Sequence, residues 1–184
     1  VLSPFLFGIV MDWVLKTSMK DGGGLDWIDG KQLSDLDFAD DIALLNSSCE
    51  GMQAMTQSPE DEARKFELVI NATKTKIMTV GKWNSTGKIT IGADDVESCE
   101  EFCYLGSTID REGGSDREVM IRLGKANGAF GRLWKMWACK KISTSVKVKL
   151  YASLVLSVLL YGAETWPMSK RITKKLEAAH HRWP

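Results

Sequence analysis

The chain has 184 residues and a mass of 20.5 kDa; 44% of the residues are hydrophobic and 26% are charged. This balance predicts a globular chain with a buried core and excludes intrinsic disorder, while the 24 basic and 24 acidic residues cancel and indicate no partner by themselves. The four cysteines are irregularly spaced, no secretory or targeting segment is visible, and the longest apolar stretch, residues 150–161, is too short to span a membrane.

The first predicted element is a helix that begins at Ser3 and continues to about Met19. Ser3 can cap its N-terminus, and Pro4 suits the first helical position. Apolar residues lie on nearly all sides of this helix, so it is expected to be buried.

Three short strands are predicted next, over residues 25–28, 32–38 and 42–45. Asp29 and Gly30 form a favoured hairpin turn between the first two. The three strands are expected to make one small antiparallel sheet.

A helix over residues 49–68 is expected to kink or to divide at Pro59, because proline removes a helical hydrogen bond. Beyond it, the pattern predicts a strand at 77–80, a polar turn at 82–87, and a strand pair formed by 88–91 and 102–109.

The charge changes along the chain. Residues 1–114 carry 10 Lys or Arg and 20 Asp or Glu, whereas residues 115–184 carry 14 and 4. In the second part apolar residues recur at helical spacing from Val119 to Trp137, and two more helices are predicted over 143–162 and from Ser169. The predicted fold class is α+β, with an α/β part before Gly114 and a basic helical part after it.

The basic part suits a polyanion, because its cations are clustered rather than interspersed with acids. The open alternative is a set of solvated helix faces that balance the acidic part. Trp134 and Trp137 are expected to pack in the core rather than to stack on bases. The clustered cations are Lys140, Lys141, Lys147, Lys149, Lys170, Arg171, Lys174 and Lys175.

Asp40 and Asp41 are the strongest candidate site. They lie in a tight turn between two apolar strands, so both carboxylates would be presented at one edge of the sheet. Two such charges repel unless a cation lies between them, and Mg²⁺ is a hard ion that prefers oxygen ligands. The alternative is that they only bond to the local backbone, as aspartates in turns often do.

Several blocks in the right order resemble the reverse transcriptase of non-LTR (LINE-type) retrotransposons. Residues 1–7 resemble the end of motif B, and Phe38-Ala39-Asp40-Asp41 resembles motif C. Residues 69–76 resemble motif D, residues 102–106 motif E, and the basic helices resemble the thumb and the segment after it, including 160–166. The resemblance implies a partial palm over 1–114 and a thumb with the start of a post-thumb segment over 115–184.

The resemblance also implies roles for individual residues. Asp40 and Asp41 would bind Mg²⁺ in the complete enzyme, which would carry out two-metal nucleotidyl transfer, and Phe38 and Ala39 would belong to the same binding site. Lys74 would lie near the triphosphate as a general acid; the alternative is a solvated lysine.

The binding partners implied are an RNA template, a DNA primer and deoxynucleoside triphosphates. Tyr104, Leu105 and Gly106 would form a hairpin that holds the primer end, although a plain core hairpin would use the same residues. Ser3 and Pro4 would begin the helix that packs beneath the template and the incoming nucleotide.

The match also departs from the family. A motif A aspartate would lie before Val1, so the chain as given is interpreted as a fragment that does not polymerise. Pro59 interrupts a usually unbroken helix, and Glu67 stands where glycine is common. These departures leave two other interpretations open, a non-catalytic nucleic-acid-binding remnant and a decayed copy that is never translated.

The remaining expectations are negative or coarse. A zinc site from Cys99, Cys103, His180 and His181 is not favoured, because the spacing is irregular. An intracellular protein without membrane contact is expected, with nucleus and cytoplasm not distinguished and the oligomeric state not determined. An unpaired sheet edge would make the isolated chain poorly soluble.

Overall fold

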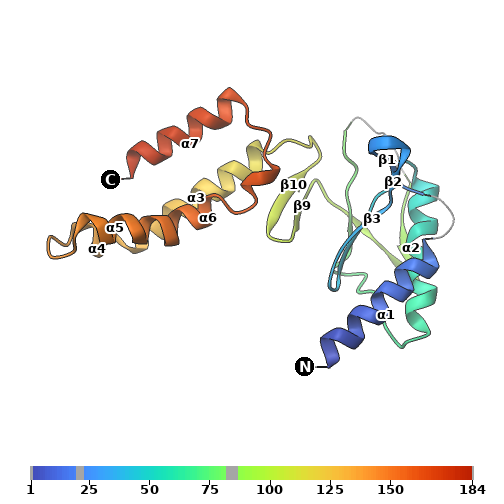
Figure 1. Ribbon diagram of the computed structural model, residues 1–184. Helices are drawn as coiled ribbons and strands as arrows, with labels where there is room; N and C mark the ends of the chain where they lie inside the picture. The colour runs from blue at the N-terminus through green and yellow to red at the C-terminus, as the bar shows by residue number, and fades with distance from the viewer. Residues whose placement is uncertain (1, 20–22, 82–86, 184) are drawn as a thin grey trace. The chain divides into compact units, whose positions relative to one another are not determined.

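The computed structural model describes residues 2–19, 23–81 and 87–183 (Figure 1). The chain forms two compact units, Val1–Glu100 and Glu101–Pro184. Helices and two-stranded ladders alternate in the first unit and helices dominate the second, which confirms the α+β class. None of the helices in the described ranges is long and apolar enough to cross a membrane.

Within its described residues the first unit holds two α-helices and four two-stranded ladders. Its elements are α1 (Ser3–Ser18), β1 (Leu25–Asp26), β2 (Gln32–Leu33), β3 (Asp35–Phe38), β4 (Asp41–Leu44), α2 (Cys49–Arg64), β5 (Lys76–Ile77), β6 (Thr90–Ile91), β7 (Asp94–Asp95) and β8 (Glu97–Ser98), with a 3-10 turn at Ile28–Gly30.

The second unit is a hairpin followed by a helical bundle. Its elements are β9 (Glu101–Tyr104), β10 (Ser107–Asp110), α3 (Asp116–Arg132), α4 (Trp134–Ala138), α5 (Thr144–Tyr151), a π-helical segment (Ala152–Leu156), α6 (Ser157–Leu159), a 3-10 turn (Ala163–Thr165) and α7 (Lys170–Arg182).

α1 packs against α2 along one narrow stripe. Val14 and Leu15 are buried there, and the rings of Trp13 and Phe66 meet edge to face at 5.2 Å. Phe5, on another side of α1, is 66% exposed, so the prediction of a buried helix was wrong. An apolar sequence buries a helix only where a neighbour covers each face, and in this unit α2 covers one.

The start of α1 also differs from the prediction. The capping position is Leu2, and Ser3 lies within the helix without a side-chain capping bond. Pro4 occupies the first turn as predicted, where its missing N–H costs little.

α2 is one continuous helix, so the predicted division into two helices at Pro59 was wrong. Met55, Pro59 and Ala63 recur every four residues and form its buried stripe. The burial of this stripe offsets the hydrogen bond that proline cannot donate. Ser48 begins the helix by accepting a bond from the Gly51 N–H at 3.0 Å.

α2 ends at Arg64 rather than at 68, in a Schellman motif. The Leu68 N–H donates to Ala63 O at 3.1 Å, the Glu67 N–H donates to Arg64 O at 3.1 Å, and Glu67 has φ +58°. Glycine is favoured in this left-handed conformation, which gives a physical reason why a glycine would suit this position.

Replacing Glu67 with glycine is therefore expected to stabilise the first unit by about 1 kcal/mol, because it removes a side chain from a left-handed backbone. Thermal unfolding followed by circular dichroism would measure the gain. Glu67→Ala is the matched control, since alanine keeps a Cβ and should bring no comparable increase; an equal gain from both variants would contradict a backbone cause.

The predicted three-stranded sheet is two separate hairpins. β1 pairs with β2, and β3 pairs with β4 in antiparallel register from Asp35↔Leu44 to Phe38↔Asp41. The predicted strand over 32–38 breaks at Ser34, whose carbonyl accepts the Leu45 N–H at 2.7 Å. Among the described residues neither β3 nor β4 pairs with a third strand.

The strand pairing farther along the chain also differs. Residues 102–109 do not pair with 88–91; β9 and β10 pair with each other, and β6 pairs with β7. β5, shorter than predicted, pairs in parallel with β8. Most of the predicted polar turn, residues 82–86, lies outside the described residues.

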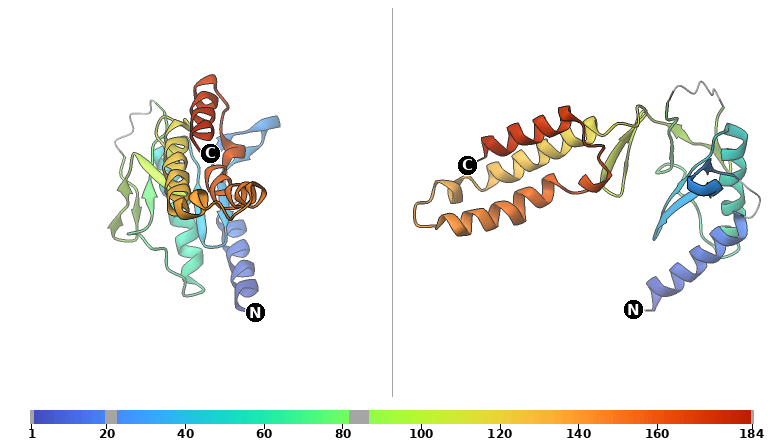
Figure 2. Two further views of the ribbon diagram at one scale, coloured as in Figure 1. Left: turned by 90° about the vertical axis from the view of Figure 1, so that its left-hand side faces the viewer. Right: turned by 45° about the horizontal axis from the view of Figure 1, so that its top comes forward.

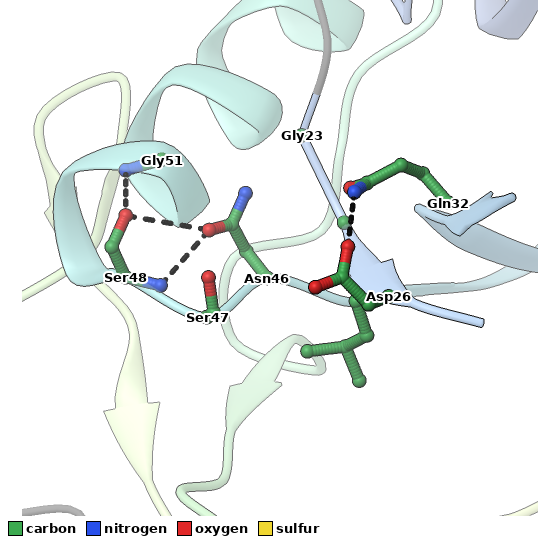
Figure 3. Close-up of a pocket in the computed structure, with 9 residues that line it drawn as sticks. Gly23, Asp26, Gln32, Asn46, Ser47, Ser48 and Gly51 are labelled. Atoms are coloured by element: carbon green, nitrogen blue, oxygen red, sulfur yellow. Dashed lines mark hydrogen bonds between the residues drawn. The ribbon is translucent and has the colours of Figure 1, made fainter. Parts of the chain in front are cut away.

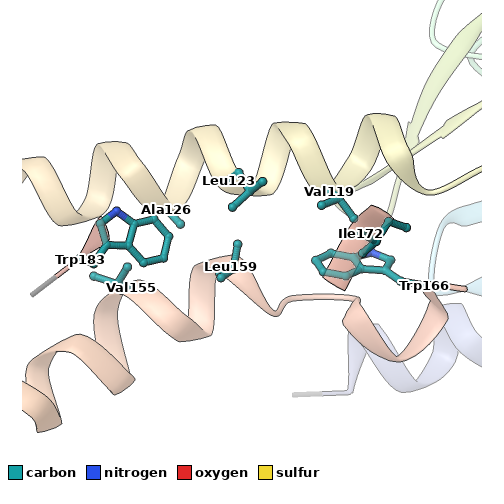
Figure 4. Packing of buried hydrophobic residues seen from close by; sticks show 8 residues of the cluster. All are labelled: Val119, Leu123, Ala126, Val155, Leu159, Trp166, Ile172 and Trp183. Atoms are coloured by element: carbon teal, nitrogen blue, oxygen red, sulfur yellow. The ribbon is translucent and has the colours of Figure 1, made fainter. Parts of the chain in front are cut away.

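The core of the second unit lies between α3, the α5–α6 run and α7, which lie side by side in Figure 1 and in both views of Figure 2. Val119, Leu123 and Ala126 supply the α3 side at helical spacing, as predicted. The full buried cluster, drawn in Figure 4, is Val119, Leu123, Ala126, Val155, Leu159, Trp166, Ile172 and Trp183.

The later helices begin where the sequence predicted. The Ser143 and Ser169 side chains cap α5 and α7 by accepting the Val146 and Ile172 N–H groups. The predicted helix over 143–162 forms as α5, the π-helical segment and α6 in succession.

The two tryptophans near the end of α3 behave differently. Trp137 stacks on Phe130 at 5.0 Å and donates its indole N–H to Phe130 O at 2.8 Å, as expected for a packed residue. Trp134 is 61% exposed, so its predicted core position was wrong. The helical phase changes between α3 and α4, which turns Trp134 away from the core.

Candidate functional site

The Asp40–Asp41 pair lies at the tip of the β3–β4 hairpin. Ala39 and Asp40 form its two-residue loop, and Asp41 begins β4 opposite Phe38. Both carboxylate residues are exposed. Hairpin strands therefore hold the two aspartates next to each other and open to solvent, as the sequence predicted.

The loop carries backbone strain. Ala39 has φ +58°, a conformation that tight hairpin loops require and that glycine adopts most easily. A non-glycine residue there costs of order 1 kcal/mol, and such strain is found often at functional sites. Phe38, which precedes the loop, is 64% exposed rather than packed in a core.

The donor atoms of the turn suit a hard divalent cation, because carboxylate oxygens are its preferred ligands. Asp37, the nearest further acid on β3, lies on the opposite face of the ladder from Asp41, since successive strand residues alternate in direction. No group of three His, Cys, Asp or Glu residues that could hold a metal occurs in the described part of the chain. These residues thus fit one cation in donor type but do not form a complete two-metal site.

Lys74 lies in a turn closed by Asn71. The Asn71 side chain accepts the Lys74 N–H at 3.1 Å and the Thr73 hydroxyl at 2.7 Å, and the Asn71 carbonyl accepts the Thr75 N–H at 3.0 Å. Lys74 is exposed, and within residues 2–19, 23–81 and 87–183 its ammonium group forms no hydrogen bond or ion pair. Asn71 therefore orders the backbone of this segment and leaves the lysine head group available.

Ser3 and Pro4, which the resemblance places beneath the template, lie in the exposed first turn of α1.

A cavity of about 470 Å³ lies in the first unit beside the start of α2 (Figure 3). There the Asn46 side chain accepts the Ser48 N–H at 2.9 Å, and the Gln32 amide donates to Asp26 at 2.5 Å. Asn46 and Ser48 build the start of α2, and Gln32 and Asp26 join β2 to β1; because these groups bond to one another, the cavity is not assigned to a ligand.

The β9–β10 hairpin turns at Leu105 and Gly106, with Tyr104 opposite Ser107. Both loop residues have positive φ, +48° and +81°. Two left-handed residues in succession are the requirement of a type I′ hairpin loop, which Asn-Gly satisfies best. The predicted hairpin at these residues is therefore present, with a leucine in a strained position.

A buried ion pair on α3 lies against this hairpin. Glu118 accepts the Arg122 Nε–H at 2.5 Å, and the side chains are 4% and 7% exposed. The second carboxylate oxygen of Glu118 accepts the Thr108 N–H at 2.8 Å, and the Arg122 guanidinium donates to Gly106 O.

Burial by itself would raise the pKa of Glu118. The hydrogen bonds from Thr108 and Arg122, together with the positive charge of Arg122, outweigh burial and lower that pKa below its ordinary value of 4.5. The sequence analysis did not select this pair. Its signal was an acid and a base four residues apart on a predicted helix, a common arrangement that is exposed in most helices.

The predicted basic cluster is partly committed to the fold of the second unit. Arg171 and Lys175 form ion pairs with Asp116 at 3.4 and 3.1 Å, and Lys147 donates to Trp137 O at 2.5 Å. Lys140, Lys141, Lys149, Lys170 and Lys174 are exposed.

The comparison with known proteins agrees with these features. The family described as reverse transcriptase (RNA-dependent DNA polymerase) matches residues 1–109. An uncharacterized transposon-derived protein of Caenorhabditis elegans is 27% identical over 83% of this chain and 56% of its own length. The RNA-directed DNA polymerase from mobile element jockey of Drosophila melanogaster is 23% identical over 93% of this chain. The RNA-directed DNA polymerase from mobile element jockey of Drosophila funebris is 27% identical over 73% of this chain.

The chain spans about half the length of the nematode relative and 19% and 16% of the two jockey polymerases. The family match covers β3, the Asp40–Asp41 turn, β4 and nearly all of the β9–β10 hairpin. Because it extends over more than half of the sequence, the chain belongs to the reverse transcriptase (RNA-dependent DNA polymerase) family.

Proposed function

We propose that this chain supplies the Asp-Asp turn and the primer-side hairpin of an RNA-directed DNA polymerase of a non-LTR retrotransposon. Reverse transcriptases use divalent metal ions and act on nucleic acids and nucleotides. The observation that supports the proposal best is the strained, exposed tip of the β3–β4 hairpin, whose two adjacent carboxylates lie within the residues that match the family.

In the proposed site Asp40 and Asp41 hold Mg²⁺ through carboxylate oxygens, with Asp40 the more direct ligand. When bound, Mg²⁺ supplies positive charge to the oxygens of the phosphoryl group being transferred. The two-residue loop and the start of β4 hold the two residues next to each other before an ion binds, which reduces the entropy lost on binding. Catalysis would require a further carboxylate that residues 2–19, 23–81 and 87–183 do not place beside them.

The other residues take positioning and proton-transfer roles in this proposal. Lys74, exposed on the turn that Asn71 orders, would lie near the triphosphate and donate a proton to the departing pyrophosphate. Tyr104, Leu105 and Gly106 would hold the primer end, and Ser3 and Pro4 would begin the helix beneath the template. The substrates would be an RNA template, a DNA primer and deoxynucleoside triphosphates.

The metal assignment predicts a specific loss on mutation. The amide signals of residues 38–42 should broaden selectively when Mn²⁺, used in place of Mg²⁺, is titrated into the isotope-labelled chain. The double variant Asp40→Asn/Asp41→Asn should weaken this binding at least about tenfold, because two charged oxygen ligands are lost. NMR spectroscopy of both proteins would measure it.

Asp35→Asn is the matched control. Asp35 is a carboxylate of the same hairpin, but it lies opposite Leu44 at the other end of the ladder, so binding should be unchanged. Equal broadening in the wild type and the double variant would overturn the metal assignment. The chain alone is expected not to extend a primer, and extension by it would contradict the need for a further carboxylate.

A second candidate function is nucleic-acid binding without catalysis. Residues 119–163 contain eight Lys or Arg residues and no Asp or Glu, and the exposed Trp134 lies in this stretch. Binding of a primer–template by the chain that is unaffected by Asp40→Asn/Asp41→Asn and by divalent ions would favour this candidate.

A further inference from the structure

The tip of the β9–β10 hairpin receives hydrogen bonds from distant parts of the second unit. Both carbonyls of its two-residue loop accept such bonds: Leu105 O from the Tyr161 hydroxyl at 2.8 Å, and Gly106 O from the Arg122 guanidinium. The Thr108 N–H donates to Glu118 at 2.8 Å. In an antiparallel pair, alternate residues direct their N–H groups away from the partner strand, and Glu118 receives one of these outward groups.

Arg122 joins these contacts into one network. Its Nε–H binds Glu118, its second nitrogen binds the loop, and its guanidinium lies 4.4 Å from the centre of the Tyr161 ring. The planar fork of arginine suits this role, because it can serve two acceptors and a ring face together, which a lysine ammonium cannot do.

The chain around Tyr161 fits closely against the loop. A Cβ added to Gly106 would lie 3.5 Å from the Tyr161 ring, and one added to Gly162 would lie 2.8 Å from Ser107 Oγ. Gly162 also has φ +74°, so both its conformation and its contact with Ser107 favour glycine. The segment 160–166, part of the retrotransposon resemblance, therefore contacts the hairpin tip directly.

We infer that Glu118, Arg122 and Tyr161, here called the hairpin clasp, are positioning residues that hold the Leu105–Gly106 loop in the conformation that receives the primer end. This inference rests on the proposed function of the hairpin. Tyr161 and Arg122 bind the loop carbonyls, which turns them toward the helices, and Glu118 holds Arg122 and the Thr108 N–H. Leu105 has a strained φ of +48°, and 39% of the residue is exposed, so its own burial does not account for this conformation. Such strain persists only where surrounding contacts enforce it, and three side chains supply those contacts here.

The test uses the whole chain and two probes, an RNA–DNA hybrid whose DNA primer has a recessed 3′ end and a blunt hybrid of the same length. Tyr161→Phe removes the hydroxyl bond to Leu105 O but keeps the ring beside Arg122 and Gly106. It should weaken binding of the recessed probe by about three- to tenfold, the effect of one lost hydrogen bond, and leave binding of the blunt probe unchanged. Arg122→Lys should reduce the discrimination further.

Arg117→Gln is the matched control, because it removes one positive charge from the same helix at an exposed pair with Glu101. It should affect both probes alike. Amide hydrogen exchange supplies a readout without nucleic acid: exchange at Thr108, whose N–H binds Glu118, should accelerate in Tyr161→Phe while the core of α3 stays protected.

The outcomes separate the two ideas. If the wild type binds both probes equally, the primer-side function of the hairpin fails and the inference fails with it. If the wild type discriminates but Tyr161→Phe and Arg122→Lys retain the discrimination, or if their Thr108 amide exchanges at the wild-type rate, the clasp is overturned while the proposed function stands.

Discussion

Glu118→Gln is expected to destabilise the second unit by about 3–5 kcal/mol, because it leaves the buried guanidinium of Arg122 without a compensating charge. Glutamine preserves the size of the side chain but has one acceptor oxygen in place of two, so the loss combines the missing charge with one of the bonds from Thr108 and Arg122. At 4% and 7% side-chain exposure, neither partner can recover its hydration. Urea unfolding followed by circular dichroism would measure the change.

The same pair predicts a pH dependence. The folded-state pKa of Glu118 lies below its ordinary value of 4.5, so its contribution to stability is complete above about pH 4.5. That contribution is lost as the pH falls through the folded-state pKa and the carboxylate becomes protonated. The wild type should thus lose stability in this range, and Glu118→Gln should show a smaller change there.

Asp116→Asn is the matched control for Glu118→Gln. Asp116 is also an acid of α3, but its side chain is 44% exposed and its partners Arg171 and Lys175 lie near the surface. Its replacement should cost no more than about 1 kcal/mol. If Glu118→Gln cost as little, the buried pair would not be an important contributor to the fold.

The second large effect concerns salt. Six cations of residues 119–163 are exposed, and no acid in this stretch competes for them; they are Lys125, Arg132, Lys135, Lys140, Lys141 and Lys149. If about six phosphates are contacted, affinity for a nucleic acid duplex should fall about 10³-fold between about 50 and 200 mM salt. Fluorescence anisotropy over a salt series would give the slope of log Kd against log salt.

Lys140→Gln/Lys141→Gln should reduce that slope by about 2, one for each phosphate contact that is lost. Lys16→Gln, which removes a lysine of α1 that pairs with Asp12, should leave the slope unchanged. A slope near zero in the wild type, or the same slope in the Lys140 and Lys141 variant, would show that these cations are solvated side chains without a phosphate partner.

The Asp40–Asp41 turn illustrates what local sequence can predict. Strand-forming residues on both sides, with acids at and beside the turn, predict a hairpin from neighbouring residues alone. The caps at Ser143 and Ser169 are local in the same sense, because each serine bonds to an N–H three residues later. The hairpin and the starts of these two helices were predicted correctly.

Pro59 and Trp134 show why other predictions were wrong. Proline weakens an isolated helix, yet the buried stripe of α2 keeps Pro59 within a continuous one. Trp134 follows the apolar spacing of α3, but the helix is interrupted before it, so its position relative to the core changes. In both cases packing between elements decides the result.

The sequence by itself determined the α+β class, the family, the acidic turn and most helix starts, because these depend on neighbouring residues or on blocks in a recognisable order. Only the tertiary structure decided that β5 pairs in parallel with β8 and that 102–109 folds on itself. It also brought Arg122 and Tyr161 to the Leu105–Gly106 loop, which Tyr161 follows by more than 50 residues. Contacts between residues so far apart depend on how buried faces fit together, and that fit leaves no local pattern in the chain.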